Sequence, residues 1–354
     1  MALKNPLAIR RKLLRWYGKH RRDLPWRRTH DPYAIWVAET MLQQTQVSTV
    51  APYYERFLRE LPSVRALHQA RFGKVLGLWS GLGYYRRAEN LKKSAGEIMR
   101  KHGGQLPNDY TALMALPGVG DYTAGALMSI AFQQPYPAID GNARRVLYRL
   151  VNPKNVKELR RFATLLVPRA RPGTFNQGLM ELGATICVPK NPHCPRCPIA
   201  THCAARAKDQ RIKTFRIAKS GVTKNVQWPL AIIRQEGKIL LRQRARKGLL
   251  ARLWELPGGE EPPRHSQRGL LASQLLELSA KFQPELRIGE FHHSITNRKI
   301  RSLVFLFDLP NNTKLRLPSR RWRWLAPASL RQFAVSSMTF KAATILANYE
   351  KNSS

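Results

Sequence analysis

The sequence is poor in acidic residues and in cysteine, and it has no long apolar run. Asp and Glu number 22 against 61 Lys and Arg, and four cysteines occur in 354 residues. The basic N-terminal stretch is interrupted by Pro6, Gly18 and Pro25 and lacks the apolar centre of a signal peptide, so we expect no secretory leader. Four cysteines in so long a chain do not predict a disulfide scaffold. A membrane span is not expected either, because it needs roughly 20 apolar residues in a row.

The excess of positive charge indicates the class of partner. The formal net charge is +39 at pH 7 and the isoelectric point is about 11.1. Such a chain repels itself in isolation, whereas binding to a phosphate polymer neutralises it and releases counterions. The alternative is a soluble protein that is merely basic. We expect a nucleic-acid partner in a reducing compartment, the cytoplasm or nucleoid of a bacterium-like cell.

All four cysteines fall within one short segment with the spacing C-x6-C-x2-C-x5-C. They are Cys187, Cys194, Cys197 and Cys203. Four thiolates on short loops can hold a zinc ion or a [4Fe–4S] cluster without further ligands. The spacing favours metal ligation over disulfides but does not choose between the two metals, because only one C-x2-C knuckle is present.

Hydrophobic spacing divides the chain into a helical domain at 1–205 and an α+β domain at 227–350, joined by a basic linker at 206–226. In the first part, apolar residues recur every three or four positions, which predicts helices at Ala34–Phe57, Ala88–His102, Tyr110–Leu116, Thr123–Phe132, Asn142–Leu150, Leu159–Val167 and Asn176–Cys187. The second part has the patterns of strands at Leu230–Arg234, Lys238–Arg242, Ile288–Ile295, Ser302–Leu309 and Arg321–Leu325, with helices at Gln267–Ala280 and Met338–Glu350.

A glycine-rich turn, Leu116-Pro117-Gly118-Val119-Gly120, lies between two predicted helices. Gly118 and Gly120 allow backbone N–H groups to face outward at the start of a helix, where they attract a phosphate. Such a helix–hairpin–helix holds DNA by its backbone and reads no sequence. The alternative is an ordinary pair of antiparallel helices.

Two carboxylates have patterns that suit the cleavage of a glycosidic bond. Asp140 precedes Gly141 at a predicted helix start, where the helix N-terminus should keep it ionised, although it could be only an N-cap. Glu39 stands among apolar residues, and its desolvation would raise its pKa, although it could be an ordinary exposed helix residue. One protonated acid and one ionised carboxylate are what such a reaction requires.

Together, the Glu39 helix, the hairpin, Asp140 and the cysteine run resemble the endonuclease III superfamily of DNA glycosylases. Trp36–Val47 (WVAETMLQQTQV) and Gly81–Tyr85 (GLGYY) are similar to its MutY branch, which removes adenine mispaired with 8-oxoguanine or guanine. The resemblance implies an all-α helix-hairpin-helix core with a [4Fe–4S] cluster on the four cysteines. It also implies a monomer that acts on double-stranded DNA.

Bifunctional members of the superfamily carry a lysine where this chain has Tyr122, and that lysine forms a Schiff base with the sugar. A tyrosine cannot form an imine. We therefore expect a monofunctional enzyme that leaves an abasic site, with little or no lyase activity.

The resemblance also implies roles for individual residues. Glu39 would protonate the adenine and later handle the water, while Asp140 would stabilise the oxocarbenium ion or trap it covalently, giving retention. The other implied contacts are Tyr122 and Asn142 around the sugar and the acid pair, Arg27 and Glu181 on the flipped adenine, Gln44 with Thr45 in the vacated space, and Leu82 and Tyr84 beside the 8-oxoguanine. The cost of extruding the base is a few kcal/mol. For each contact, core packing is the alternative.

The second domain resembles a Nudix-like domain that reads 8-oxoguanine. Leu253–Gly259 (LWELPGG) matches the start of that fold, but the acidic metal-binding helix of an active Nudix hydrolase is missing after it. Many members have Phe-Ser-His in the recognition loop, where this chain has Ile295, Thr296 and Asn297 after Ser294. We expect Ser294, Thr296 and Asn297 to contact the lesion; a hairpin with a polar turn is the alternative.

Three other functions compete with adenine excision. The first is an endonuclease III-like glycosylase and lyase on oxidised pyrimidines. The second is a non-enzymatic, metal-stapled DNA-binding protein. The third is a nucleotide hydrolase that uses the second domain.

Overall fold

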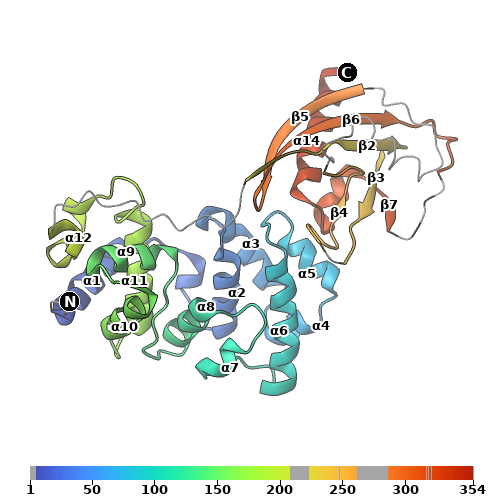
Figure 1. Ribbon diagram of the computed structural model, residues 1–354. Coiled ribbons are helices and arrows are strands. Elements are labelled where there is room, and N and C mark those ends of the chain that lie inside the picture. The colour runs from blue at the N-terminus through green and yellow to red at the C-terminus, as the bar shows by residue number, and fades with distance from the viewer. Residues whose placement is uncertain are drawn as a thin grey trace. The chain divides into compact units, whose positions relative to one another are not determined.

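A computed structural model describes residues 5–207, 223–246, 248–260, 286–315, 317, 319 and 321–353. The chain forms two compact units. One comprises Met1–Ala70 and Arg86–Ala218, and the other comprises Arg71–Tyr85 and Lys219–Ser354. The first unit is helical and the second is built on a sheet (Figure 1).

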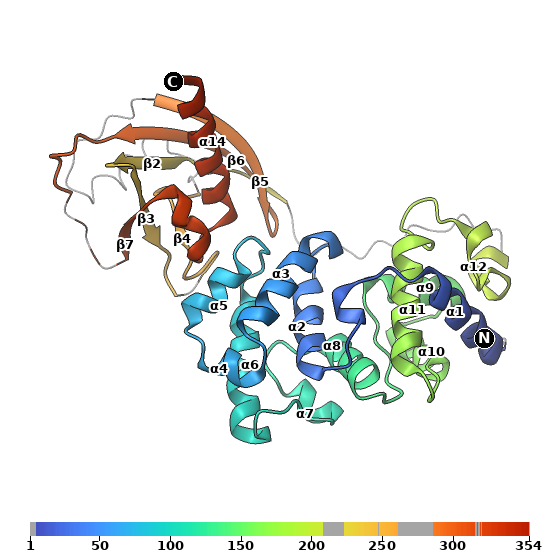
Figure 2. The ribbon, with the colours of Figure 1, turned by 180° about the vertical axis from the view of Figure 1, so that it is seen from behind.

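The helical unit contains α1 Pro6–His20, α2 Pro32–Leu42, α3 Val47–Glu60, α4 Val64–Gln69, α6 Arg86–His102, α7 Tyr110–Met114, α8 Asp121–Ala126, α9 Gly141–Val151, α10 Val156–Leu166, α11 Pro172–Thr185 and α12 Ala204–Ala207. Helices α1, α9 and α11 lie side by side (Figure 2). Their apolar faces and that of α10 share one core, in which Leu13, Leu147, Leu166 and Phe175 are fully buried. An amphipathic stripe on each of these helices supplies that core.

Helix α2 is the central element for function. Asp31 caps it by accepting hydrogen bonds from the N–H groups of Tyr33 and Ala34, and Pro32 fits its first turn. Nine of its eleven residues are buried. Such a helix is apolar on every side and must lie inside the unit, so the acidic Glu39 is carried into the interior with it.

The predicted helix Ala34–Phe57 is wrong, because the structure divides it into α2 and α3. Gln43 ends α2 in a non-helical conformation, and Gln44 is left-handed with φ 60°. Periodicity continues across this break and therefore hides it. The segment that carries the resemblance is consequently a helix end followed by a short loop.

The predicted helix Thr123–Phe132 also differs in detail. Helix α8 gives way to a π-helical turn at Leu127–Ala131, which periodicity does not reveal. Asn176 donates to the Ser129 hydroxyl at 2.8 Å and to the Tyr136 carbonyl at 2.8 Å. The bond to Ser129 joins the π turn to α11. π turns are frequent at functional sites.

The second unit contains a seven-stranded mixed sheet. Its strands are β1 Lys224–Gln227, β2 Leu230–Gln235, β3 Lys238–Gln243, β4 Trp254–Glu255, β5 Leu286–Ile295, β6 Arg298–Asp308 and β7 Trp322–Leu325. The central order is β1-β6-β2-β3-β4, with β5 on β6 and β7 on β3. Helix α14, Ser337–Ser353, packs on one face through Met338, Ala342 and Leu346.

Helix α5, Phe72–Trp79, groups with the sheet unit although the sequence placed it in the helical domain. The Ser80 hydroxyl donates to the Val335 carbonyl at 2.8 Å. The predicted linker 206–226 lies mostly outside the described residues, but β1 begins within it at Lys224. The predicted helix Gln267–Ala280 lies wholly outside them.

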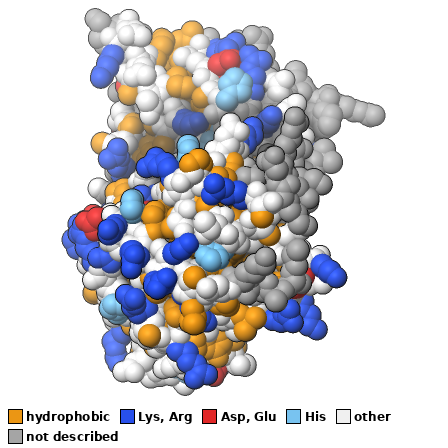
Figure 3. All heavy atoms as spheres, turned by 90° about the vertical axis from the view of Figure 1, so that its left-hand side faces the viewer, with side chains coloured by type: hydrophobic (Ala, Val, Ile, Leu, Met, Phe, Trp, Pro, Cys, Tyr) orange, Lys and Arg blue, Asp and Glu red, His pale blue; other side chains and the backbone are white. Residues whose placement is uncertain are grey.

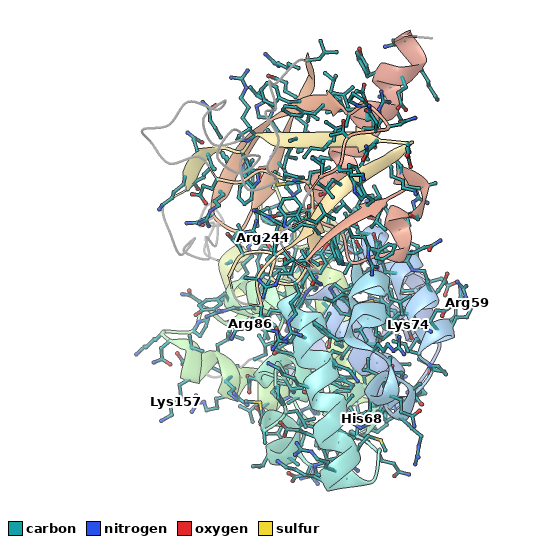
Figure 4. All side chains as sticks on the ribbon, turned by 90° about the vertical axis from the view of Figure 1, so that its right-hand side faces the viewer. Arg59, His68, Lys74, Arg86, Lys157 and Arg244 are labelled. Atoms are coloured by element: carbon teal, nitrogen blue, oxygen red, sulfur yellow. The ribbon has the colours of Figure 1, made fainter. Side chains whose placement is uncertain are left out.

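Basic side chains cover the surface. On the face shown in Figure 3, Lys and Arg are spread over the exposed surface and Asp and Glu are few. Arg59 on α3 and Lys157 on α10 are exposed and project from the ribbon (Figure 4). Within the described residues, no helix is both long enough and apolar enough to cross a membrane.

Candidate active site

A cleft of about 1010 Å³ in the helical unit brings together most of the predicted site residues. It is lined by the end of α2 and the following loop, the starts of α8 and α9, one face of α11, and the segment before α2. Its lining includes the predicted residues Arg27, Glu39, Gln44, Thr45, Tyr122, Asp140, Asn142 and Glu181.

Glu39 is the acid of this cleft. It is 5% exposed, and the Tyr122 hydroxyl donates a hydrogen bond to its Oε2 atom. Burial raises the pKa of Glu39 to about 7; the Tyr122 hydrogen bond opposes this rise, and the negative charge of Asp140 adds to it. A carboxylic acid in this environment holds its proton near neutral pH and can donate it.

Asp140 is the second carboxylate, and it caps α9. Its Oδ1 atom accepts the Ala143 N–H at 2.6 Å, and its Oδ2 atom accepts the Asn142 side-chain amide at 3.2 Å. Burial raises the pKa of Asp140, while these two donors and the nearby Arg145 oppose the rise. The predicted influence of the helix N-terminus is present, but the sequence did not reveal the burial that works against it.

Glu181 on α11 is a third carboxylate, and two arginines hold it. Arg22 binds it through Nε at 2.7 Å and Nη2 at 2.9 Å, and Arg27 binds it through Nη2 at 2.8 Å. Burial favours the neutral acid, but the hydrogen bonds from Arg22 and Arg27 outweigh it and lower the pKa of Glu181. The cleft therefore contains a fixed anionic acceptor in addition to its proton donor.

Sequence reasoning missed Arg22 and Arg145. Arg22 lies in a run of basic residues that no motif distinguishes. Arg145 donates from Nη2 to the Asn142 side chain at 2.9 Å and to the Gly183 carbonyl at 2.6 Å, and from Nε to the Cys187 carbonyl at 2.8 Å. Its position three residues after Asn142 on α9 was the available signal, since that spacing places the two side chains on one face of the helix.

The hairpin Leu116–Gly120 joins α7 to α8 as predicted. Gly118 has φ +79°, and a Cβ there would lie 2.7 Å from the Cβ of Asn90. Gly120 precedes α8 in an extended conformation with open space around it. The backbone thus explains Gly118, whereas Gly120 has neither a positive φ nor a close neighbour that requires glycine. Tyr122 is the second residue of α8.

The four cysteines line one small pocket together with Arg149 and Arg206. All four thiols are free, and the Arg149 guanidinium donates to the Cys187 sulfur at 3.2 Å. In the described ranges, no three His, Cys, Asp or Glu side chains are close enough to form a ready metal site. Burial raises the pKa of Cys197 to about 11, and the neighbouring thiols add to the rise. A bound metal cation would stabilise the thiolates. The donor set fits an iron–sulfur cluster or zinc.

The remaining predicted contacts do not line the cleft. Leu82 is buried, and Tyr84 is 46% exposed with φ 48°; both lie in the segment that groups with the sheet unit. Ser294, Thr296 and Asn297 lie at the end of β5 and in the turn to β6. Thr296 has φ 53°, which is unusual for a β-branched residue.

The chain matches two family models. Residues 37–169 match the HhH-GPD superfamily of base excision DNA repair proteins, and residues 230–344 match the NUDIX domain. The human adenine DNA glycosylase is 35% identical over 397 residues, covering 93% of this chain and 72% of the human protein. The adenine DNA glycosylase of Mycolicibacterium smegmatis is 41% identical over 202 residues, covering 55% of this chain and 69% of that protein.

Among solved structures, that of a thermostable thymine-DNA glycosylase superposes with a TM-score of 0.55 at 32% identity, covering 58% of this chain and 98% of that one. The cleft lies in the helical unit, to which most of the residues matched by the HhH-GPD model belong.

Proposed function

Since this chain belongs to the adenine DNA glycosylases of the HhH-GPD superfamily, we propose that its cleft hydrolyses the N-glycosidic bond of adenine mispaired with 8-oxoguanine or guanine. The family is that of base-excision repair enzymes, which are hydrolases acting on N-glycosyl bonds. The observation that carries the proposal is the pairing of a buried acid, Glu39, with a carboxylate at a helix N-terminus, Asp140, in one cleft.

In the proposed reaction, adenine leaves the stack and enters the cleft, because the bond cannot be reached inside the duplex. Glu39 holds a proton at neutral pH and donates it to the leaving base. Glu181, kept ionised by Arg22 and Arg27, accepts from the base.

Asp140 faces the developing positive charge on the sugar. Its acceptor bonds from Ala143 and Asn142 favour the ionised form, whereas Glu39 has one such donor, Tyr122. Two carboxylates with opposite protonation states then act on one bond, as glycoside cleavage requires. A transient bond between Asp140 and the anomeric carbon, formed as the bond to adenine breaks and then hydrolysed by water, would give retention.

Tyr122 supports a monofunctional enzyme. Its hydroxyl is engaged with Glu39, and it offers no amine to the sugar. The lyase alternative would need such an amine in the cleft.

Cys187, Cys194, Cys197 and Cys203 would hold a [4Fe–4S] cluster, as is usual in this family. When bound, the cluster ties the loop after α11 to the unit by metal–thiolate bonds. Arg149 places a positive charge against one of these sulfurs.

The sheet unit would read the base opposite adenine through Ser294, Thr296 and Asn297, with Leu82 and Tyr84 acting from the segment that groups with it. Gln44 and Thr45 would occupy the space vacated by adenine.

A single-turnover excision assay tests the proposal. Duplexes that pair adenine with 8-oxoguanine, guanine or thymine are treated with alkali after incubation, so that abasic sites appear as strand breaks. We expect breaks with 8-oxoguanine and guanine, none with thymine, and no borohydride cross-link. A cross-link on an oxidised-pyrimidine duplex would support the lyase alternative.

A further inference from the structure

We infer that Arg87, a buried arginine on α6 outside the cleft lining, is a positioning residue that fixes the end of α2 and the loop Gln43–Thr45 for the extrusion of adenine. The inference rests on the proposed function, because it assigns that loop to the space that the base leaves. Arg87 is 8% exposed although it carries a full charge.

Four hydrogen bonds from the Arg87 guanidinium go to this one segment. Its Nη1 atom lies 3.0 Å from the Thr40 carbonyl, 2.6 Å from the Met41 carbonyl and 2.5 Å from the Gln43 carbonyl. Its Nη2 atom donates to the Thr45 hydroxyl at 3.0 Å. One guanidinium therefore spans the last turn of α2 and the first residues beyond it.

These contacts answer a physical requirement of the helix end. The last four carbonyls of a helix have no hydrogen-bond partner within the helix. In many helices a glycine after the last turn lets following backbone N–H groups bind these carbonyls, but α2 ends at Gln43 without one. Because α2 is buried on all sides, water is a poor substitute. A cation at the helix C-terminus also meets the negative end of the helix dipole.

The fixed segment is the part of the cleft that carries strain. Gln44 has φ 60°, a conformation that costs free energy for a non-glycine residue, and it lines the cleft together with Gln43 and Thr45. Gln43 is held in addition by its side chain, which donates to the Thr123 hydroxyl at 3.2 Å. With the carbonyls and the Thr45 hydroxyl bound, the loop needs no further ordering when the base leaves the stack.

A lysine cannot replace this function. Its ammonium is a compact point charge without the planar fork that reaches α2 and Thr45 at once. Arg87→Lys therefore keeps the net charge and leaves part of the carbonyl set unsatisfied. The neighbouring Arg86 is exposed at the start of α6 (Figure 4), so Arg86→Lys is the matched control.

The test measures extrusion separately from chemistry. In a Glu39→Gln background, which blocks excision, 2-aminopurine replaces the target adenine and its fluorescence reports unstacking on enzyme binding. The excision rate per active enzyme and its dependence on pH are measured in the otherwise wild-type protein.

We expect Arg87→Lys to lower both the fluorescence rise and the excision rate by about 10- to 100-fold, in line with the cost of a misplaced group. The midpoint of the pH profile should stay unchanged, because Arg87 does not contact Glu39, and Arg86→Lys should match the wild type. Thr45→Val, which removes one partner and leaves α2 capped, should give a smaller loss of fluorescence.

A purely structural role would lower the melting temperature and the active fraction while leaving the rate per active enzyme and the fluorescence unchanged; that result overturns the inference. A shifted pH midpoint with normal fluorescence overturns it too, since Arg87 would then act on the acid. Failure of wild-type excision on both mispairs contradicts the proposed function instead, and the fluorescence comparison still decides on Arg87.

Discussion

Glu39 is a single residue whose burial sets both stability and chemistry. Its pKa in the folded state is about 7, against an ordinary value of 4.5. The folded state therefore binds a proton that the unfolded chain has released between these two values. Stability from this group is fully present below about pH 4.5 and is lost as the pH rises to 7.

Glu39→Gln replaces the titrating carboxyl group by a neutral amide and so removes this loss of stability at high pH. We predict that the variant is more stable than the wild type at pH 8, by at most about 3 kcal/mol, with little difference at pH 4.5. Melting temperatures at the two pH values check it. An equal gain at both would show that packing, and not the titration of Glu39, is responsible. Excision should be lost at all pH values.

Single residues also mark the limit of sequence reasoning. Glu39, Asp140 and Tyr122 were found because their neighbours form distinctive patterns. Arg22 and Arg87 were not, because one basic residue among the 61 Lys and Arg of this chain carries no signal until the fold shows what it binds. Burial is decided by tertiary packing, which no local pattern contains.

At the scale of elements, Asp140 serves α9 as well as the reaction. Asparagine is an equally good N-cap. We predict that Asp140→Asn changes the free energy of unfolding by no more than about 1 kcal/mol and that the variant still binds DNA. Its rate of single-turnover excision should fall by about 10³-fold, because the charge that faces the sugar is lost. Excision within tenfold of the wild type would show that Asp140 is only a cap.

The hairpin between α7 and α8 is a second element with a direct test. Gly118→Ala places a Cβ on a residue with positive φ and within 2.7 Å of the Asn90 side chain. We predict a stability loss of about 1–2 kcal/mol and weaker binding to mispaired and matched duplexes alike, since a clamp of this kind would hold the phosphate backbone and not the base edges. Gly120→Ala, which meets open space, is the control. Weakened binding of the mispair alone would argue against a backbone clamp.

Periodicity predicted most helices and strands to within a few residues, yet it joined α2 to α3. The break at Gln43 depends on Arg87, which is more than 40 positions away and supplies the carbonyls with partners. Hydrophobic periodicity likewise did not reveal that α5 groups with the sheet unit. Long-range partners are the common cause of both errors.

For the whole molecule, charge and the cysteine loop give one prediction each. With +39 charges, binding should weaken steeply with salt, and log Kd against log salt should have a similar slope for matched and mispaired DNA. Fluorescence anisotropy from 50 to 300 mM salt measures both slopes. A salt-independent Kd would exclude the phosphate backbone as the main contact.

Cys197→Ser tests the cysteine pocket in the complete chain. We predict loss of bound iron and of absorbance near 400 nm, together with a lower melting temperature, because the loop loses its metal–thiolate bonds. Iron content and absorbance are read independently of activity. Zinc in the wild-type protein, in place of iron, would contradict the cluster.

The most direct measurement is the single-turnover rate of adenine excision opposite 8-oxoguanine as a function of pH. A buried proton on Glu39 predicts a rate that declines as the pH rises through about 7, and a rate near zero for Glu39→Gln throughout. A rate that stays constant or increases from pH 6 to 9 would contradict the assignment of Glu39 as the acid that releases the base.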